Sequence, residues 1–325
     1  MRWLGAVGIV GVVVMLPAVG DGADWPRYHF DNQNTGYSPT ETLQFPMYLK
    51  WTYQVQSPAV ATSPPIVVGS KVYFCSQTGS PNPAGNQVLA VDRNTAALIW
   101  SFTAGDVLSM PTYGSDGLIY VTSEDQHLYC LDPGTGALMW SFVLAGGNGY
   151  GAPLFEAGSV YTVSKPKEVY RIDASSHTLV WSYETVLWPA TWPWLSTDGS
   201  SLFVDGSEDV TYALNLTNGA VNWSYTRGAM TQGGGNNPVS GGLVYLRPGN
   251  TPSPMAIAVT ASGGAFAWSY SCDDTVAYSI RPNFFSSRAI RARSRWRRTP
   301  FREPFSGATL PQEDSLTTPS LATPW

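Results

Sequence analysis

Short runs of apolar and aromatic residues alternate with turn-forming residues along most of the chain. Each run is a few residues long and is bounded by Gly, Pro, Asp or Asn, as in residues 69–77 and 158–164. Runs of this length and composition predict β-strands joined by tight turns. The pattern therefore predicts an all-β protein in which long helices are scarce.

One arrangement of polar and apolar positions recurs five times. In each copy a turn-opening residue stands eight positions before a tryptophan, and the tryptophans follow one another at steps of 40, 41, 42 and 45 residues. A constant period of this length indicates a repeat architecture. The copies are Asp92 to Trp100, Asp132 to Trp140, Asp173 to Trp181, Asn215 to Trp223 and Thr260 to Trp268.

Two further marks precede each copy. A proline lies in a first short strand, and an apolar-aromatic pair follows a Gly-containing turn in a second strand. The third strand ends at the turn-opening residue and the fourth carries the tryptophan, so each unit has four antiparallel strands. The prolines are Pro64 or Pro65, Pro111, Pro153, Pro193 and Pro238; the pairs are Val72-Tyr73, Ile119-Tyr120, Val160-Tyr161, Leu202-Phe203 and Val244-Tyr245.

The turn before each tryptophan explains the spacing. Asp or Asn accepts hydrogen bonds from the backbone just ahead of it, and Gly supplies a positive φ. The indole is then buried between neighbouring sheets, where its N–H can reach a backbone acceptor. A sheet this small cannot bury both faces alone, so the units must stack, and radial stacking makes a β-propeller. A β-sandwich is the competing all-β fold, but it requires no equivalent hairpins at a constant period.

The repeat is incomplete at both ends. Residues 50–55 look like a lone copy of the fourth strand, of the kind that a propeller lends to its last blade. Residues 275–280 offer one more strand. We therefore predict five complete blades and a partial sixth within residues 50–280, and leave open whether the ring closes.

The pattern ends after Arg281. Residues 281–325 contain 8 Arg, no Lys and 3 acidic residues, and finish in a Ser/Thr/Pro-rich stretch. Three interpretations compete: a disordered tail, an arginine-rich nucleic-acid arm, or a segment that is not the native continuation, as a shifted reading frame would produce. Loss of register in mid-blade favours the last, and we predict disorder here.

Composition narrows the function classes. Apolar residues make up 43% of the chain and charged residues 13%, with 32 Gly and 25 Pro, which excludes a disordered or coiled-coil protein. Residues 1–280 hold 10 Lys and Arg against 20 Asp and Glu. Such an acidic body offers no basic face to nucleic acid.

The N-terminus has the layout of a secretory signal peptide. A short positive start is followed by an apolar run over residues 4–16, then Pro17 and the small residues 18–20. The run is too short to span a bilayer. We predict removal of residues 1–20, a leader over 21–49, a secreted or periplasmic protein, and no membrane span after cleavage. Cys75, Cys130 and Cys272 leave room for one disulfide and one spare thiol.

Catalytic motifs are missing. The histidines are scattered, and we find no nucleophile elbow, HExxH motif or glycine-rich phosphate loop. Asp92, Asp132 and Asp173 could be a calcium or acid-base set, but their equivalence in the repeat favours turn formation. We predict no catalytic, cofactor-binding or metal-binding residues.

One aromatic cluster contains tryptophans that have no counterpart in the other repeat units. The cluster contains Trp188, Trp192 and Trp194, and the last two flank Pro193 in the predicted innermost strand of a unit. Aromatic side chains near a channel mouth can stack on a sugar, a quinone or a peptide side chain, although packing between blades is the simpler explanation. These three tryptophans are the candidate ligand-binding residues.

The repeat resembles the quinoprotein repeat of pyrroloquinoline-quinone (PQQ) proteins, most clearly over residues 128–140, LYCLDPGTGALMW. The leader segment 25–37, WPRYHFDNQNTGY, is also similar to the opening of secreted quinoprotein-like propellers. The resemblance covers roughly residues 24–275 and implies the propeller fold. In that family the PQQ dehydrogenases are longer, typically eight-bladed, and carry a catalytic Asp, calcium-binding acids and a vicinal Cys pair.

This chain has no adjacent cysteines, and other members of the family use the repeat without cofactor or catalysis. The leading hypothesis is therefore an exported, non-catalytic propeller that binds or scaffolds a protein or glycan, with no cofactor. The alternative is a truncated or degenerate quinoprotein dehydrogenase that uses PQQ with calcium.

Overall fold

The computed structural model describes residues 11–16, 23–40, 48–55, 60–61, 63–77, 85–106, 108–147, 151–165, 168–185, 195–205, 210–227, 237–246, 255–271, 276–281 and 284–289. The chain divides into two compact units, residues 1–292 and 293–325. All described residues belong to the first unit, which therefore holds every described strand.

Five antiparallel sheets, each a blade, follow one another along the described chain, and strands pair in chain order within each. Blade 1 has an innermost strand in two pieces, β3 (Val60–Ala61) and β4 (Ile66–Val68), then β5 (Lys71–Gln77), β6 (Gln87–Asp92) and β7 (Leu98–Thr103). Blade 2 comprises β8 (Thr112–Tyr113), β9 (Ile119–Ser123), β10 (His127–Leu131) and β11 (Leu138–Val143). Blade 3 comprises β12 (Leu154–Glu156), β13 (Ser159–Ser164), β14 (Glu168–Asp173) and β15 (Leu179–Glu184).

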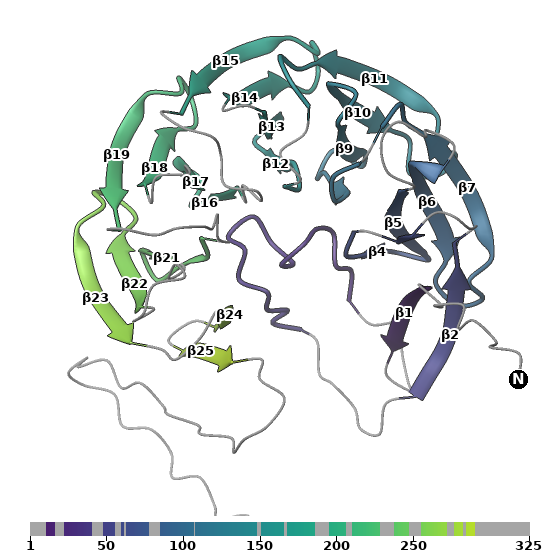
Figure 1. Ribbon diagram of the computed structural model, residues 1–325, viewed down its shortest axis with the longest axis horizontal. Helices are drawn as coiled ribbons and strands as arrows, with labels where there is room; N and C mark the ends of the chain where they lie inside the picture. The colour runs from purple at the N-terminus through teal and green to yellow at the C-terminus, as the bar shows by residue number, and fades with distance from the viewer. Residues whose placement is uncertain are drawn as a thin grey trace, which may run out of the picture. The chain divides into compact units, whose positions relative to one another are not determined.

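Blade 4 comprises β16 (Ser196–Thr197), β17 (Ser201–Asp205), β18 (Val210–Asn215) and β19 (Val221–Thr226). Blade 5 comprises β20 (Val239–Ser240), β21 (Leu243–Leu246), β22 (Met255–Thr260) and β23 (Phe266–Ser271). The sheets follow an arc, with the first strand of each blade innermost and β7, β11, β15, β19 and β23 on the outside (Figure 1). This arrangement confirms the predicted β-propeller of four-stranded blades, and the described strands form no closed sheet.

The hydrophobic core lies between neighbouring blades. One cluster joins Tyr73 and Trp100 of blade 1 to Ile119 and Leu131 of blade 2. Corresponding clusters join blade 2 to blade 3, blade 3 to blade 4 and blade 4 to blade 5. Each sheet thus buries its faces against the next one, as the small size of a single blade requires.

Most blade tryptophans donate a hydrogen bond to the turn of the following blade. Trp100 Nε1 donates to the carbonyl of Pro133 at 3.0 Å. The acceptor is the residue directly after the turn-opening residue in sequence. The same bond recurs from Trp181 to Leu216 and from Trp223 to Ala261. Trp51, in β2 (Tyr48–Gln54), donates likewise to Arg93 of blade 1 at 2.8 Å. Strand β2 therefore stands where the outer strand of a preceding blade would stand, as its sequence predicted.

Trp140 departs from this rule. Its Nε1 is buried and has no hydrogen-bond partner among the described residues. The turn it packs on carries His177 where blades 2, 4 and 5 have Gly136, Gly219 and Gly264 and blade 1 has Ala96. The imidazole stacks on the indole at a centroid distance of 4.8 Å. His177 also has a φ of 59°, a region that favours glycine.

Replacing His177 with glycine should therefore stabilise the protein. The change removes a positive-φ side chain and lets the indole reach the carbonyl of Ala174, the acceptor equivalent to Pro133. These gains outweigh the lost stacking, and we expect the free energy of unfolding to rise by about 1 kcal/mol. Urea unfolding of H177G beside the parent chain measures this, and an unchanged or lower value would contradict the explanation.

Two details differ from the sequence-based expectation or add to it. Pro65, Pro111, Pro153 and Pro238 precede the innermost strands rather than lie within them, because proline has no N–H for the sheet ladder. Strands β24 (Val276–Arg281) and β25 (Phe284–Ala289) form a hairpin, so β25 lies inside the predicted disordered segment. Residues 290–325 are outside the described part, and for them disorder stays a prediction.

The predicted signal peptide contributes one described element. Strand β1 (Gly11–Leu16) pairs with β2 in antiparallel register. Removal of residues 1–20 stays a prediction, as do the remaining domain boundaries. The described residues include no helix of the length and hydrophobicity that a membrane crossing requires.

Candidate functional site

The predicted ligand-binding residues Trp188, Trp192 and Trp194 lie outside the described residues. The Gly-rich stretch at residues 232–237 also lies outside the described part, except for Asn237. The hypothesis that the three tryptophans bind a ligand therefore stays a prediction. The described residues instead reveal three polar features: the leader on the inner strands, a charged face, and a buried ion pair.

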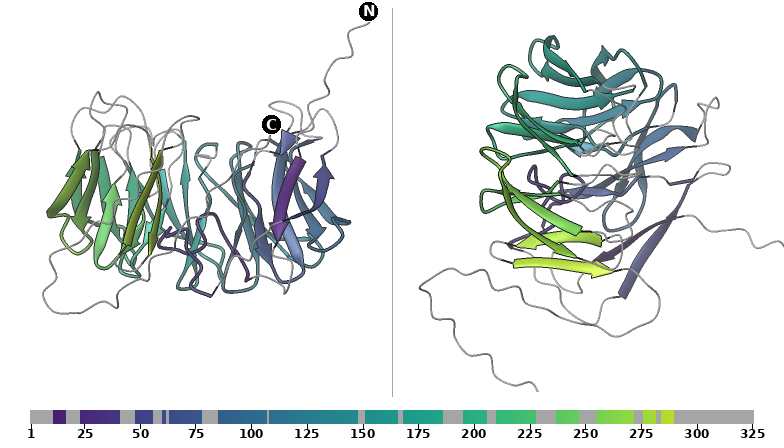
Figure 2. Two further views of the ribbon diagram at one scale, coloured as in Figure 1. Left: turned by 90° about the horizontal axis from the view of Figure 1, so that it is seen from below. Right: turned by 60° about the vertical axis from the view of Figure 1, so that its left-hand side comes forward.

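The leader runs along the innermost strands of all five blades, a placement that the sequence did not suggest. Trp25 forms a two-way backbone bridge with Val67 of blade 1. Further along, the carbonyls of Pro26, Asn32 and Gln33 accept backbone N–H bonds from blades 2, 4 and 5. The donors are Tyr113, Thr197 and Val239, at 2.8, 2.9 and 2.8 Å. The leader, purple in Figure 2, lies near one end of the blades.

Side chains of the leader complete this contact. Asn32 Nδ2 donates to the carbonyl of Phe155 at 2.7 Å and to Glu156 Oε2 at 2.8 Å, which joins the leader to blade 3. Arg27 Nη2 and Asn34 Nδ2 converge on the carbonyl of Leu195, at 3.3 and 3.0 Å. Burial lowers the pKa of Arg27 to about 10, while Asp31 and Glu156 act in the opposite direction.

His29 makes the leader sensitive to acid. Burial, with a smaller contribution from the Arg27 charge, lowers its pKa from 6.5 to about 4. A base with a lowered pKa in the folded state favours folding above its unfolded pKa, and that contribution is lost as the pH falls from about 6.5 towards 4.

We therefore expect the free energy of unfolding to fall by about 1–2 kcal/mol between pH 7 and pH 5. His29→Asn should remove most of this loss, since Asn tolerates the φ of 61° at this position without titrating. Urea unfolding at both pH values compares the two chains. Equal pH dependence in both would show that His29 is not the titrating group.

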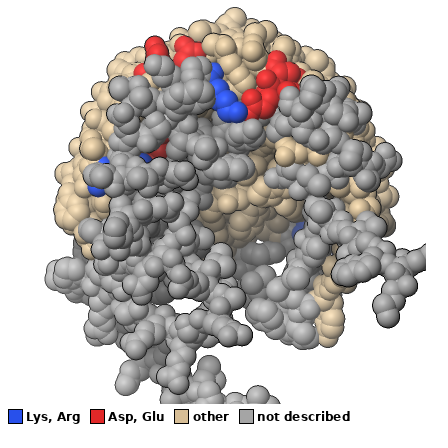
Figure 3. All heavy atoms as spheres, viewed as in Figure 1, with Lys and Arg blue, Asp and Glu red and all other residues tan. Residues whose placement is uncertain are grey.

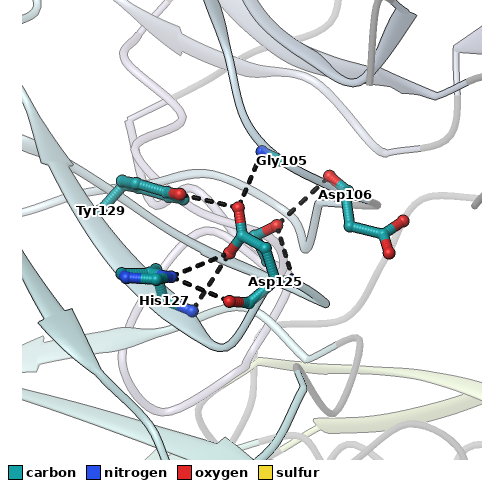
Figure 4. A network of polar contacts seen from close by, with 6 residues as sticks. Gly105, Asp106, Asp125, His127 and Tyr129 are labelled. Carbon is teal, nitrogen blue, oxygen red and sulfur yellow. Dashed lines mark hydrogen bonds and ion pairs between the residues drawn. The ribbon is translucent and has the colours of Figure 1, made fainter. Parts of the chain in front are cut away.

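The charged face lies where one blade connects to the next. Within an antiparallel blade, the connection between the second and third strands is at the same end as the connection to the next blade. On blade 2 this end carries Asp125, whose carboxylate accepts from Gly105 N at 2.7 Å and from Tyr129 Oη at 2.7 Å (Figure 4). His127 Nδ1 lies 2.9 Å from the Asp125 carbonyl, and its ring stacks on Tyr129. The rest of the imidazole points away from this network (Figure 4).

An ion pair joins this face of blade 2 to blade 3. Lys165 Nζ lies 2.6 Å from Glu124 Oε1. The linker between the two blades passes over them, because Lys165 N donates to the Gly147 carbonyl at 2.8 Å. A Cβ at Gly147 would stand 2.2 Å from Glu124 Oε2, so a larger residue there would displace the Glu124 carboxylate. Charged groups of both signs gather in the upper part of Figure 3, above the same blades. We call this surface, around Glu124, Asp125, His127 and Lys165, the connecting face.

A fully buried ion pair lies at the end of blade 4, between the last residue of β17 and the residue that follows β19. Arg227 Nη1 lies 3.1 Å from Asp205 Oδ2, with side chains 1% and 0% exposed. The other carboxylate oxygen accepts from Thr211 Oγ1 at 2.6 Å and from Asn237 Nδ2 at 2.7 Å. Since Asn237 lies just before the innermost strand of blade 5, the network fixes the junction of the two blades.

The repeated aspartates form turns, as predicted. Asp132 Oδ1 accepts from Gly134 N, Thr135 N and Thr135 Oγ1 at 2.8–3.0 Å, and Asp92 and Asp173 make equivalent bonds. These bonds lower the pKa of all three carboxylates. Cys75 and Cys130 are free thiols, buried with pKa values raised to about 12, so no disulfide joins them. Cys272 lies outside the described residues.

The sequence and the fold of this chain are similar to those of known proteins. A family model described as outer membrane protein assembly factor BamB matches residues 84–236, which include β6 and β7 of blade 1 and the strands of blades 2 to 4. This match and the solved structures described next support a β-propeller of the PQQ type. No curated protein sequence matches the chain significantly.

Solved structures share the fold at low sequence identity. Quinohemoprotein alcohol dehydrogenase from Comamonas testosteroni is 16% identical with a TM-score of 0.57, over 82% of this chain and 51% of that one. A europium-containing methanol dehydrogenase is 17% identical with a TM-score of 0.55, over 77% and 58%. BamB from Moraxella catarrhalis is 16% identical with a TM-score of 0.45, over 66% and 75%. This PQQ-type propeller thus spans about half the length of the dehydrogenases.

Proposed function

We propose that this PQQ-type propeller is an exported, non-catalytic module that binds a protein partner and acts as a scaffold, without a cofactor. The observation that carries the proposal is the leader, which takes up hydrogen-bonding positions on the innermost strands of all five described blades. The innermost strands of a propeller surround its central axis, and here a segment of the same chain, the leader, lies on them.

The acidic residues support a structural rather than a catalytic role. Asp92, Asp132 and Asp173 are held in turns, and Asp205 is paired with Arg227. No three His, Cys, Asp or Glu among the described residues are grouped so that they could hold a metal ion. These residues do not fit PQQ with calcium, and the chain also lacks a vicinal Cys pair.

The connecting face is the binding surface we propose. Hydrogen bonds and the Lys165–Glu124 pair hold its loops in place before a partner arrives, which lowers the entropic cost of association. The description of the matching family, an assembly factor, favours a protein partner over a glycan. Export to the periplasm fits both that description and the N-terminal sequence.

Photo-crosslinking in the source organism tests this function. A crosslinking amino acid at His127 should give a discrete protein adduct, whereas the same group at Leu98, which is 51% exposed on the outer strand of blade 1, should give none. Absence of an adduct from His127 would contradict binding at the connecting face. Replacing Trp192 and Trp194 with alanine should abolish the adduct if the tryptophans contribute to the site, and an unchanged adduct would remove them from it.

A quinoprotein dehydrogenase with lost or missing parts is the second candidate. The structural likeness to alcohol and methanol dehydrogenases favours it. That likeness shows the fold, and it leaves the activity to experiment.

A further inference from the structure

The innermost strands have backbone groups that are not used within their own blades. The leader forms hydrogen bonds with these groups, blade after blade. The residues bound by its main chain, Val67, Tyr113, Thr197 and Val239, all belong to the first strand of their blades. Addition of a segment to exposed strand edges is a general mode of peptide recognition, in which backbone bonds give affinity and side chains give specificity. The leader therefore binds as a peptide ligand binds.

Three polar side chains give this contact its specificity. Asn32 donates to the blade 3 carbonyl of Phe155, while Arg27 and Asn34 meet at the carbonyl of Leu195, at the entrance to blade 4. Arg27 also donates to Asn32 Oδ1 at 3.1 Å, so the guanidinium and the carboxamide position each other. A ligand for these strands is thus a peptide with the spacing Arg-x4-Asn-x-Asn.

Apolar contact adds to these bonds. The ring of Tyr28 packs against Met110 and Ala152, which are buried on the inner side of blades 2 and 3. All described contacts between the leader and the blades are of these kinds: backbone bonds, polar side chains and apolar packing. None is covalent, and the described part of the leader, residues 23–40, is joined to the blades only through residues 41–47, which follow it in sequence.

The bound leader also carries unfavourable features. His29 and Phe30 have φ values of 61° and 75°, and for a bulky side chain such as that of Phe30 this region is rarely occupied. Arg27 Nε and Asn34 Oδ1 are buried without a hydrogen-bond partner among the described residues. Strained dihedrals and unpaired buried polar atoms each oppose docking. The favourable contacts must offset them, so the net affinity is moderate, and tethering raises the effective concentration that keeps the leader bound.

We propose that the innermost strands of the five blades form a peptide-binding site, that the leader over residues 24–36 occupies it as a tethered ligand, and that a second peptide of the same pattern can displace the leader. The propeller then has two states at this end of the blades. In one the leader covers the inner strands, and in the other a peptide bound from outside replaces it.

Cleavage of the folded chain tests this proposal. A specific protease site placed within residues 41–47 of the chain starting at Asp21 separates leader and propeller after folding. The leader fragment should remain bound, as native mass spectrometry detects. A fluorescent synthetic peptide of residues 22–40 in excess should then replace it, with a measurable dissociation constant. The same peptide carrying Asn32→Ala should bind at least 10-fold more weakly, since it loses the contacts to blade 3.

Two outcomes would overturn the proposal. Either the fragment leaves on cleavage and the wild-type peptide shows no saturable binding, or the N32A peptide binds as tightly as the wild type. Should the inserted site prevent folding, limited proteolysis of the uncut chain takes its place. Asn32→Ala should then raise the rate of cleavage within the leader at least 10-fold while the blades stay resistant, and an unchanged rate rejects the tethered ligand. Neither readout depends on the partner of the connecting face.

Discussion

Replacing Asp205 with alanine should lower the free energy of unfolding by about 3–5 kcal/mol, the range for a buried ion pair that loses one partner. The substitution leaves the Arg227 guanidinium buried with its carboxylate gone, and it also removes the acceptor of Thr211 and Asn237. Because this network joins blade 4 to blade 5, the loss should appear in the main unfolding transition. Urea unfolding at pH 7 measures it.

Two variants separate the charge effect from other causes. The double variant D205L/R227M replaces both charges with apolar groups and should recover more than half of the loss, since an apolar pair avoids the desolvation of an unpaired charge. Asp198→Ala removes an exposed turn carboxylate from the same blade and should cost about 1 kcal/mol or less. If D205A and D198A were equally mild, the buried pair would not hold the junction.

Replacing Gly136 with alanine should cost about 2–3 kcal/mol. A Cβ at this position would stand 2.5 Å from the indole of Trp100, and the φ of 72° adds backbone strain. We expect the indole of Trp100 to shift while it keeps its bond to Pro133, as Trp51 keeps its bond to Arg93 in the turn that has Ala96 at this position.

Gly158→Ala is the matched control. Gly158 has a φ of 74°, and no atom lies within 4 Å of the Cβ that the substitution would add, so only the strain remains. The control should cost about 1 kcal/mol. If both variants lost the same free energy of unfolding, the contact of the new Cβ with Trp100 would add no cost. The tryptophan of the preceding blade would then not require a glycine at position 136.

The blade repeat could be predicted because its determinants are close together in sequence. The Asp132 carboxylate bonds to Gly134 and Thr135, two and three residues away, and Trp100 meets its acceptor one repeat later. Spacing alone therefore identified the turn, the buried indole and the role of β2 as an outer strand. His177 was visible as an exception to the turn glycine, and the structure shows what that exception does to Trp140.

The leader could not be placed in this way. Its partners are mostly backbone groups, and a carbonyl such as that of Leu195 leaves no mark on the sequence. Asn32 contacts residues more than 120 positions away. The pairing of Asp205 with Arg227 was hidden for a similar reason, since both stand at strand ends where charged residues are usually exposed. The tryptophans of residues 188–194 remain a hypothesis from the sequence.

Titration with PQQ in the presence of calcium tests the non-catalytic assignment most directly. The full chain is incubated with both, binding is followed by tryptophan fluorescence, and turnover by dye-linked oxidation of an alcohol or sugar. A non-catalytic propeller, with its leader on the inner strands, should show neither saturable binding nor turnover. Stoichiometric binding of PQQ accompanied by dye reduction would contradict the assignment and identify the chain as a dehydrogenase.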